Sequence, residues 1–152
     1  LAAATLGDLA GGWLSDWLAR KTGSLRWARR SVAITGFVVA AACILPATLT
    51  ADRLLSAALT ALGLFGLELT VGVSWAVVVD IGPEFAGSIS GVMNMCGNLG
   101  GALSPLVFAN LLERYDWRAP FLVACGLLLL GAICYLRIDP DDKIAASHFV
   151  PG

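Results

Sequence analysis

Four long stretches of the chain contain almost no charged residue, and they constrain its fold more than any other feature. They are residues 31–49, 54–79, 85–112 and 119–136, and their only charge is Glu68. About 20 mostly apolar residues in a helix cross the hydrocarbon layer of a bilayer, whereas a soluble helix of that length needs a polar face. The sequence therefore predicts an all-α integral membrane protein with four complete transmembrane helices. Residues 1–14 are predicted to be the end of a fifth.

The overall composition agrees with this prediction and excludes several classes of protein. Of 152 residues, 58% are hydrophobic and 14% are charged, against about a quarter charged in soluble domains. Lys and Arg nearly balance Asp and Glu, so no basic surface for nucleic acid is expected. The cysteines lie far apart in apolar runs and lack zinc-site spacing, so no metal site or cofactor is expected. No paired intramembrane catalytic set is present in the sequence, and an enzyme is therefore not expected.

The distribution of Lys and Arg predicts which ends of the helices face the cytoplasm. Basic residues concentrate between residues 20 and 30 and recur in the tail of residues 137–152, while the next loop holds only Arg53. Because basic loops resist translocation, the first loop and the C-terminal tail are predicted to be cytoplasmic. The chain opens in mid-helix and without Met. We therefore expect a fragment that lacks an N-terminal half.

The first basic loop carries a recognisable pattern. Gly12 is followed by Asp16 and then by the basic pair Arg20 and Lys21. A Gly permits close helix approach, an acid can face a helix N-terminus, and a basic pair can hold acids or lipid headgroups. This pattern resembles the gating loop of the major facilitator superfamily, although Trp17 replaces a usual basic residue and Ala19 a usual Gly. By the pseudo-symmetry of that family, Asp16 is expected to address a helix N-terminus of the missing half.

Residues 68–77, 80–83 and 91–105 look like the anion:cation symporter branch of that superfamily, and residues 138–140 look like the tail of its bacterial members. The resemblance implies twelve spans, of which this chain would supply the end of the eighth through the twelfth. It also implies symport of a small organic anion, such as a sugar acid or carboxylate, with H⁺ or Na⁺ across a bacterial inner membrane. Ser74, Trp75 and Asn94 stand at positions that match solute contacts.

Glu68 is the candidate coupling residue, because an acid within a span costs about 3 kcal/mol to insert. Gly72 and Trp75 follow it at one and two helical turns, so these three residues share a face. Glu68 is interpreted either as a protonated acid bonded to a neighbouring helix or as a proton carrier in a wet cavity. Asp8 is interpreted either as an acid that lines the cavity or as a group that forms a hydrogen bond between helices. A non-transporting membrane subunit or receptor is the rival to a transporter, and it predicts dry packing around Glu68.

The third complete span carries a stripe of small and polar residues. Its members recur every three or four positions and are Gly87, Gly91, Asn94, Asn98, Gly101 and Pro105. The two amides either join helices or contact the solute. With the resemblance, the second interpretation gives Ser74, Trp75, Asn94 and Asn98 as the predicted substrate-binding residues. All Lys and Arg lie outside the spans, so a cationic partner for an anion is expected from the missing half.

Overall fold

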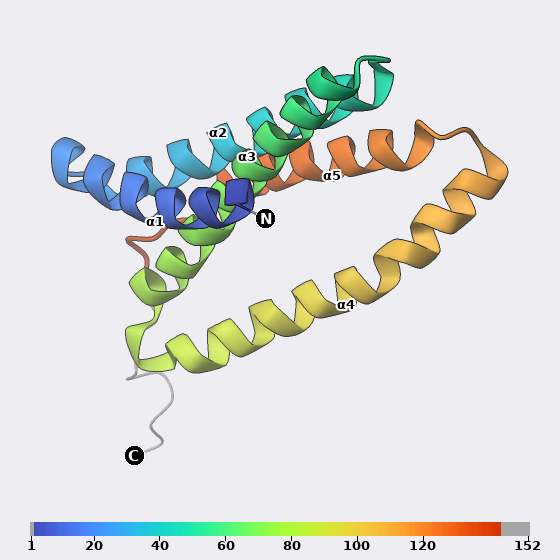
Figure 1. Cartoon of the computed structure of the whole chain (residues 1–152). Coiled ribbons are helices and arrows are strands. Elements are labelled where there is room, and N and C mark those ends of the chain that lie inside the picture. Colours follow the sequence, from blue (N-terminus) through green and yellow to red (C-terminus); the bar gives the residue numbers. More distant parts are fainter. Residues whose placement is uncertain (1, 144–152) are drawn as a thin grey trace.

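The structure, a computed structural model, describes residues 2–143, and every regular element in that range is a helix (Figure 1). This confirms the all-α prediction. The elements in chain order are α1 (Ala2–Thr22), α2 (Leu25–Leu49), α3 (Arg53–Ile81), the single 3₁₀ turn η1 (Pro83–Phe85), α4 (Ala86–Arg114) and α5 (Ala119–Tyr135).

Three segments within residues 2–143 are long and apolar enough to cross a membrane. They are α2, α3 and the continuous stretch from η1 through α4. The fourth predicted span corresponds to α5, which is apolar but has 17 residues. At 1.5 Å per residue it extends about 26 Å, close to the hydrocarbon thickness of about 30 Å.

Local chemistry explains where the helices start and stop. Gly23 ends α1 with a φ of 70°, which favours glycine, and its N–H donates to the Ala19 carbonyl at 2.9 Å. The Ser24 hydroxyl accepts from the Trp27 N–H at 3.3 Å and so caps α2. Asp52 caps α3 in the same way, accepting from the Leu54 N–H at 2.8 Å.

The connection between the first two helices is much shorter than the sequence suggested. Helix α1 continues to Thr22, so Gly12, Asp16, Arg20 and Lys21 lie on a helix. The prediction that they form a loop was wrong, because no Gly or Pro stands between Gly12 and Gly23 to end the helix. Only Gly23 and Ser24 separate α1 from α2.

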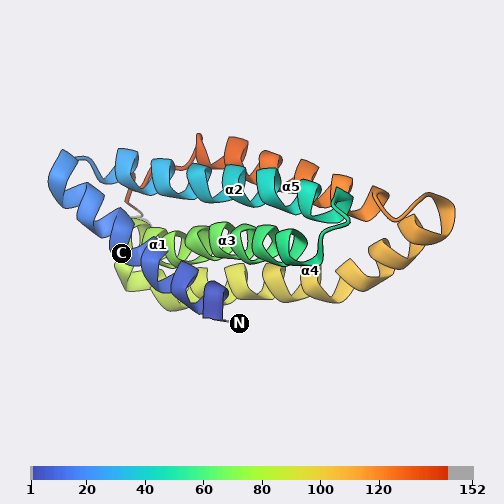
Figure 2. The ribbon, with the colours of Figure 1, turned by 45° about the horizontal axis from the view of Figure 1, so that its top comes forward.

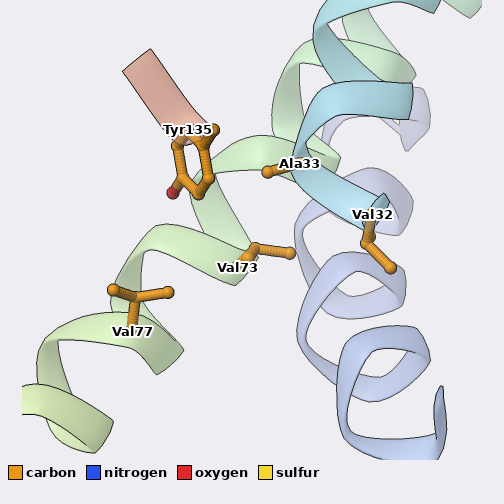
Figure 3. Packing of buried hydrophobic residues seen from close by; sticks show 5 residues of the cluster. All are labelled: Val32, Ala33, Val73, Val77 and Tyr135. Atoms are coloured by element: carbon orange, nitrogen blue, oxygen red, sulfur yellow. The ribbon is translucent and has the colours of Figure 1, made fainter. Parts of the chain in front are cut away.

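Helix α3 is the centre of the packed part of the molecule. Helices α1 and α2 pack on α3, and α5 packs on α2 (Figures 1 and 2). Glycines permit the closest approaches: a Cβ on Gly11 would collide with the Leu69 carbonyl, and one on Gly72 with the Asp8 carbonyl. The buried cluster of Val32, Ala33, Val73, Val77 and Tyr135 joins α2, α3 and α5 (Figure 3).

Helix α4 stands apart from this packed group. Figure 1 shows it as a long arm that meets the other helices mainly at its two ends. None of its residues is buried, and a Cβ on any of its glycines would meet nothing within 4 Å. Residues 2–143 therefore leave most of the surface of α4 without a protein partner.

Candidate functional site

Glu68 lies at the crossing of α1 and α3. A Cβ placed on Gly7 would be 2.9 Å from the Glu68 Cβ, so α1 passes directly beside the acid. The side chain is partly buried, and no hydrogen bond or ion pair reaches its carboxylate from residues 2–143. Glu68 therefore has no bond to a neighbouring helix in this part of the chain.

Asp8 flanks the same crossing from the opposite helix. Its carbonyl lies against Gly72, which is one helical turn beyond Glu68, and its side chain is exposed. Two carboxyl-bearing residues from different helices thus lie within about a turn of each other. The sequence alone could not place them together, because they are 60 positions apart.

The four predicted solute contacts do not share one pocket within the described residues. Ser74 lines a cavity of about 630 Å³ between α3, α4 and α5. Trp75 is 42% exposed and is not among the residues lining that cavity. Asn94 and Asn98 are exposed on α4, and the Asn98 amide donates to the Asn94 carbonyl at 2.9 Å.

The Ser74 hydroxyl is already paired within the protein. It donates to the Thr70 carbonyl at 2.7 Å, and it lies 2.5 Å from the Tyr135 hydroxyl at the end of α5. Tyr135 was missed from the sequence, where it read as one residue of the uncharged stretch 119–136. A hydroxyl one residue before the end of an uncharged stretch was the only available signal.

A buried ionic cluster joins the ends of α1, α2 and α3. Its centre is Arg29, which is 5% exposed. The Arg29 guanidinium donates to Asp16 at 2.6 Å, to the Ser15 hydroxyl at 2.6 Å and to Asp80 at 2.8 Å. Ser15 is fully buried and donates its own proton to the Gly12 carbonyl at 3.0 Å.

This cluster changes the interpretation of the loop residues. Asp16 pairs with Arg29 of the same bundle, although half of its side chain remains exposed. Arg20 and Lys21 are exposed and form no ion pair with residues 2–143. The Lys21 Nζ instead lies 4.9 Å from the centroid of the Trp17 ring. The close helix approach lies at Gly11, while a Cβ on Gly12 would meet nothing within 4 Å.

Arg29 and Asp80 were not identified as functional from the sequence. Arg29 read as one of several basic residues of a cytoplasmic loop, and Asp80 as a charge that ends a span. Their pairing across 51 positions requires the helices to be packed. The signal that could have found them is that each lies at the end of an apolar run, where a lone charge needs a partner.

The chain also matches known families and proteins. The model of the Major Facilitator Superfamily matches residues 1–151. A probable sulfoacetate transporter of Cupriavidus necator is 41% identical over 92% of this chain and 33% of its own length. The D-galactonate transporter of Escherichia coli is 34% identical over 93% of the chain and 33% of its own length. A hexuronate transporter of Bacillus subtilis is 29% identical over 87% of the chain.

The chain spans about a third of the length of these relatives. All three are named as transporters of organic anions, and none of the three is named as an enzyme. The matched family, the apolar helices and the relatives agree with one another. The chain is an integral membrane protein that belongs to the Major Facilitator Superfamily.

Proposed function

We propose that this chain is the C-terminal part of a secondary transporter that moves a small organic anion by symport with H⁺ or Na⁺. The observation that carries the proposal is the 41% identity to a protein named as a sulfoacetate transporter, together with the galactonate and hexuronate relatives. The solute site would lie between this bundle and a preceding bundle of the full-length protein. Access to it would alternate between the two membrane faces, as in other transporters built from paired bundles.

The missing bundle would provide the positive charge for the anion. In this chain the buried Arg29 is already shared between Asp16 and Asp80, which leaves it no charge to offer a solute. The remaining described Lys and Arg lie outside residues 31–49, 54–79, 85–112 and 119–136. This bundle would instead supply the indole of Trp75, the amides of Asn94 and Asn98 and the hydroxyl of Ser74.

Glu68 is the proposed coupling residue. Its carboxylate has no partner in residues 2–143, and it lies near Asp8 at the α1–α3 crossing. A proton taken up by Glu68 would reduce the repulsion of an incoming anion, so that proton uptake and anion uptake favour each other. The distribution of Lys and Arg further supports a cytoplasmic C-terminus. The bacterial relatives support a location in a bacterial inner membrane.

The experiment is uptake of sulfoacetate, D-galactonate and a hexuronate by cells that express the full-length protein. Glu68→Gln is expected to abolish accumulation driven by a pH gradient while anion exchange down a concentration gradient persists. Glu113→Gln is the matched control, because Glu113 is exposed at the end of α4. Accumulation by Glu68→Gln equal to that of the parent would exclude Glu68 as the coupling residue. Absence of uptake of any organic anion by the parent would instead favour a non-transporting subunit.

A further inference from the structure

Two basic residues at the end of α1 take no part in the ionic contacts of the bundle. Arg20 and Lys21 lie in the last turn of α1, are exposed and pair with no acid in residues 2–143. On the neighbouring α2, by contrast, Arg26 and Arg29 form ion pairs, and the Arg30 Nε donates to a backbone carbonyl. The end of α1 therefore carries two positive charges without a counter-charge in the described part of the chain.

An apolar groove lies between α1 and α2 beside these charges. The two helices diverge from their short connection (Figure 2), and the groove between them has a volume of about 260 Å³. It is lined by Leu14, Leu18, Ser31, Val32, Thr35 and Leu69. Four of these six side chains are hydrocarbon, so the groove suits an apolar chain better than a polar solute.

Helical spacing places a cation and an indole at one end of this groove. Lys21 follows Leu18 by three residues, so it continues the face of α1 that lines the groove. Trp27 precedes Ser31 by four residues on the lining face of α2, and it is 71% exposed. The Lys21 Nζ lies 4.9 Å from the centroid of the Trp17 ring. The end of the groove nearest the connection is therefore basic and aromatic, while its walls are apolar.

This arrangement is complementary to an anionic phospholipid. Indole rings of membrane proteins concentrate at the depth of the lipid headgroups. Basic side chains at the cytoplasmic surface attract anionic headgroups, and the hydrocarbon stem of a lysine can lie along an apolar wall while its ammonium group reaches the phosphate. The groove below then faces the acyl chains.

We propose that the groove between α1 and α2 binds one anionic phospholipid of the cytoplasmic leaflet. An acyl chain would lie against Leu14, Leu18 and Leu69, and the phosphate would pair with Lys21, with Arg20 in the same turn adding to the attraction. The inference goes beyond the proposed function, because it depends on neither the transported solute nor the coupling ion. It uses only the cytoplasmic location of this end of the bundle that the distribution of Lys and Arg predicts.

The first test measures binding of dioleoylphosphatidylglycerol and dioleoylphosphatidylcholine to the delipidated full-length protein by native mass spectrometry. The parent should bind the anionic lipid at least about fivefold more tightly. Arg20→Gln combined with Lys21→Gln should weaken that binding by about 10- to 30-fold, because each basic residue contributes about fivefold. Arg137→Gln combined with Lys143→Gln is the matched control. It removes the same charge from exposed residues beyond α5 and should leave binding within about twofold.

The second test blocks the groove and keeps both cations. Thr35→Trp places an indole in the groove, and because Thr35 is exposed the ring does not displace a buried side chain. Binding of dioleoylphosphatidylglycerol should fall by at least about fivefold, to the level of attraction by the two charges alone. Leu130→Trp is the control, since it adds the same ring at an exposed site on α5. Glycerol phosphate, which carries the phosphate without acyl chains, should not displace the lipid.

Each part of the inference has an outcome that overturns it. Equal affinity for the two lipids, or equal weakening by the two charge-removing pairs, would exclude recognition of the headgroup at Arg20 and Lys21. Unchanged binding by Thr35→Trp would exclude the groove, and displacement by glycerol phosphate would mean that the cations bind a soluble anion. A parent that binds neither lipid would indicate that another segment of the protein covers the groove. None of these measurements uses uptake, so failure of the proposed function is detected separately.

Discussion

At the scale of single residues, Arg29 forms two ion pairs, more than any other residue among residues 2–143. A guanidinium that is 5% exposed is stable only because two carboxylates and a serine hydroxyl surround it. Two helices contribute these partners, α1 with Ser15 and Asp16 and α3 with Asp80, while Arg29 itself lies on α2. The side chain therefore acts as a joint between α1, α2 and α3.

Replacing Arg29 should be severely destabilising. Arg29→Met leaves the largely buried Asp80 without its counter-charge, and removal of one member of a buried ion pair costs about 3–5 kcal/mol. We expect a clear fall in the thermal unfolding midpoint of the purified full-length protein in detergent. Arg20→Met, at an exposed site, should leave the midpoint unchanged.

A further variant distinguishes the effect of the unpaired carboxylates from the effect of losing the packing of the Arg29 side chain. Arg29→Met combined with Asp16→Asn and Asp80→Asn removes the whole charge set and should recover part of the lost stability. If the triple variant unfolds at a lower temperature than Arg29→Met alone, the carboxylates stabilise the bundle by some route other than Arg29.

At the scale of helices, glycines mark the places where neighbours touch. The α1–α3 crossing is built on Gly11 and Gly72, which both lie against backbone of the opposite helix. Adjacent Gly12 has open space where its Cβ would be. On α1, Gly11 thus has no room for a side chain, whereas the neighbouring Gly12 has room for one.

This pair gives a matched test of the α1–α3 crossing. Gly11→Ala should force the two helices apart and lower the free energy of unfolding by about 1–3 kcal/mol, the usual cost of overpacking. Gly12→Ala should be neutral or slightly stabilising, because alanine favours a helix. The measurement is the thermal midpoint of each full-length variant. Equal midpoints for the two variants would contradict the crossing described here.

The helices were largely predictable from the sequence, and the contacts between them were not. Uncharged runs identified α2 to α5, because lipid excludes charge from a span. The extent of α1 was missed, because the charged residues of its last two turns have the composition that is typical of a loop. The bonds of Arg29 to Asp80 and of Ser74 to Tyr135 join residues 51 and 61 positions apart. Helical periodicity places such residues on faces but does not say which faces meet.

At the scale of the whole molecule, α4 is the element whose surroundings are incomplete. It has no buried residue, while α1, α2, α3 and α5 each have several. Its Asn94 and Asn98 lie on one face, and Cys96 lies on the opposite face of the same turns. In the transporter that we propose, only one of these faces would border a water-filled solute path.

A thiol placed on the amide face should therefore react faster than the native one. In the full-length protein, a water-soluble maleimide should modify Asn94→Cys, made in a Cys96→Ser background, at least about tenfold faster than it modifies Cys96 in the parent. Thiols in lipid or in a dry interface react slowly because the thiolate needs water. Faster modification of Cys96 would mean that α4 turns its amides away from the solute path.

The two-residue turn between α1 and α2 limits how this bundle can move. Gly23 is hydrogen-bonded to the last turn of α1, and Ser24 caps the start of α2. Both residues are therefore restrained, and the turn has little conformational freedom. A tilt of α1 would then be transmitted to the first two turns of α2, which carry Arg26, Arg29 and Arg30 and their contacts. A displacement that starts near Glu68 would in this way reach Ile138 and Asp139, just after α5, through arginine side chains, without a flexible loop to absorb it.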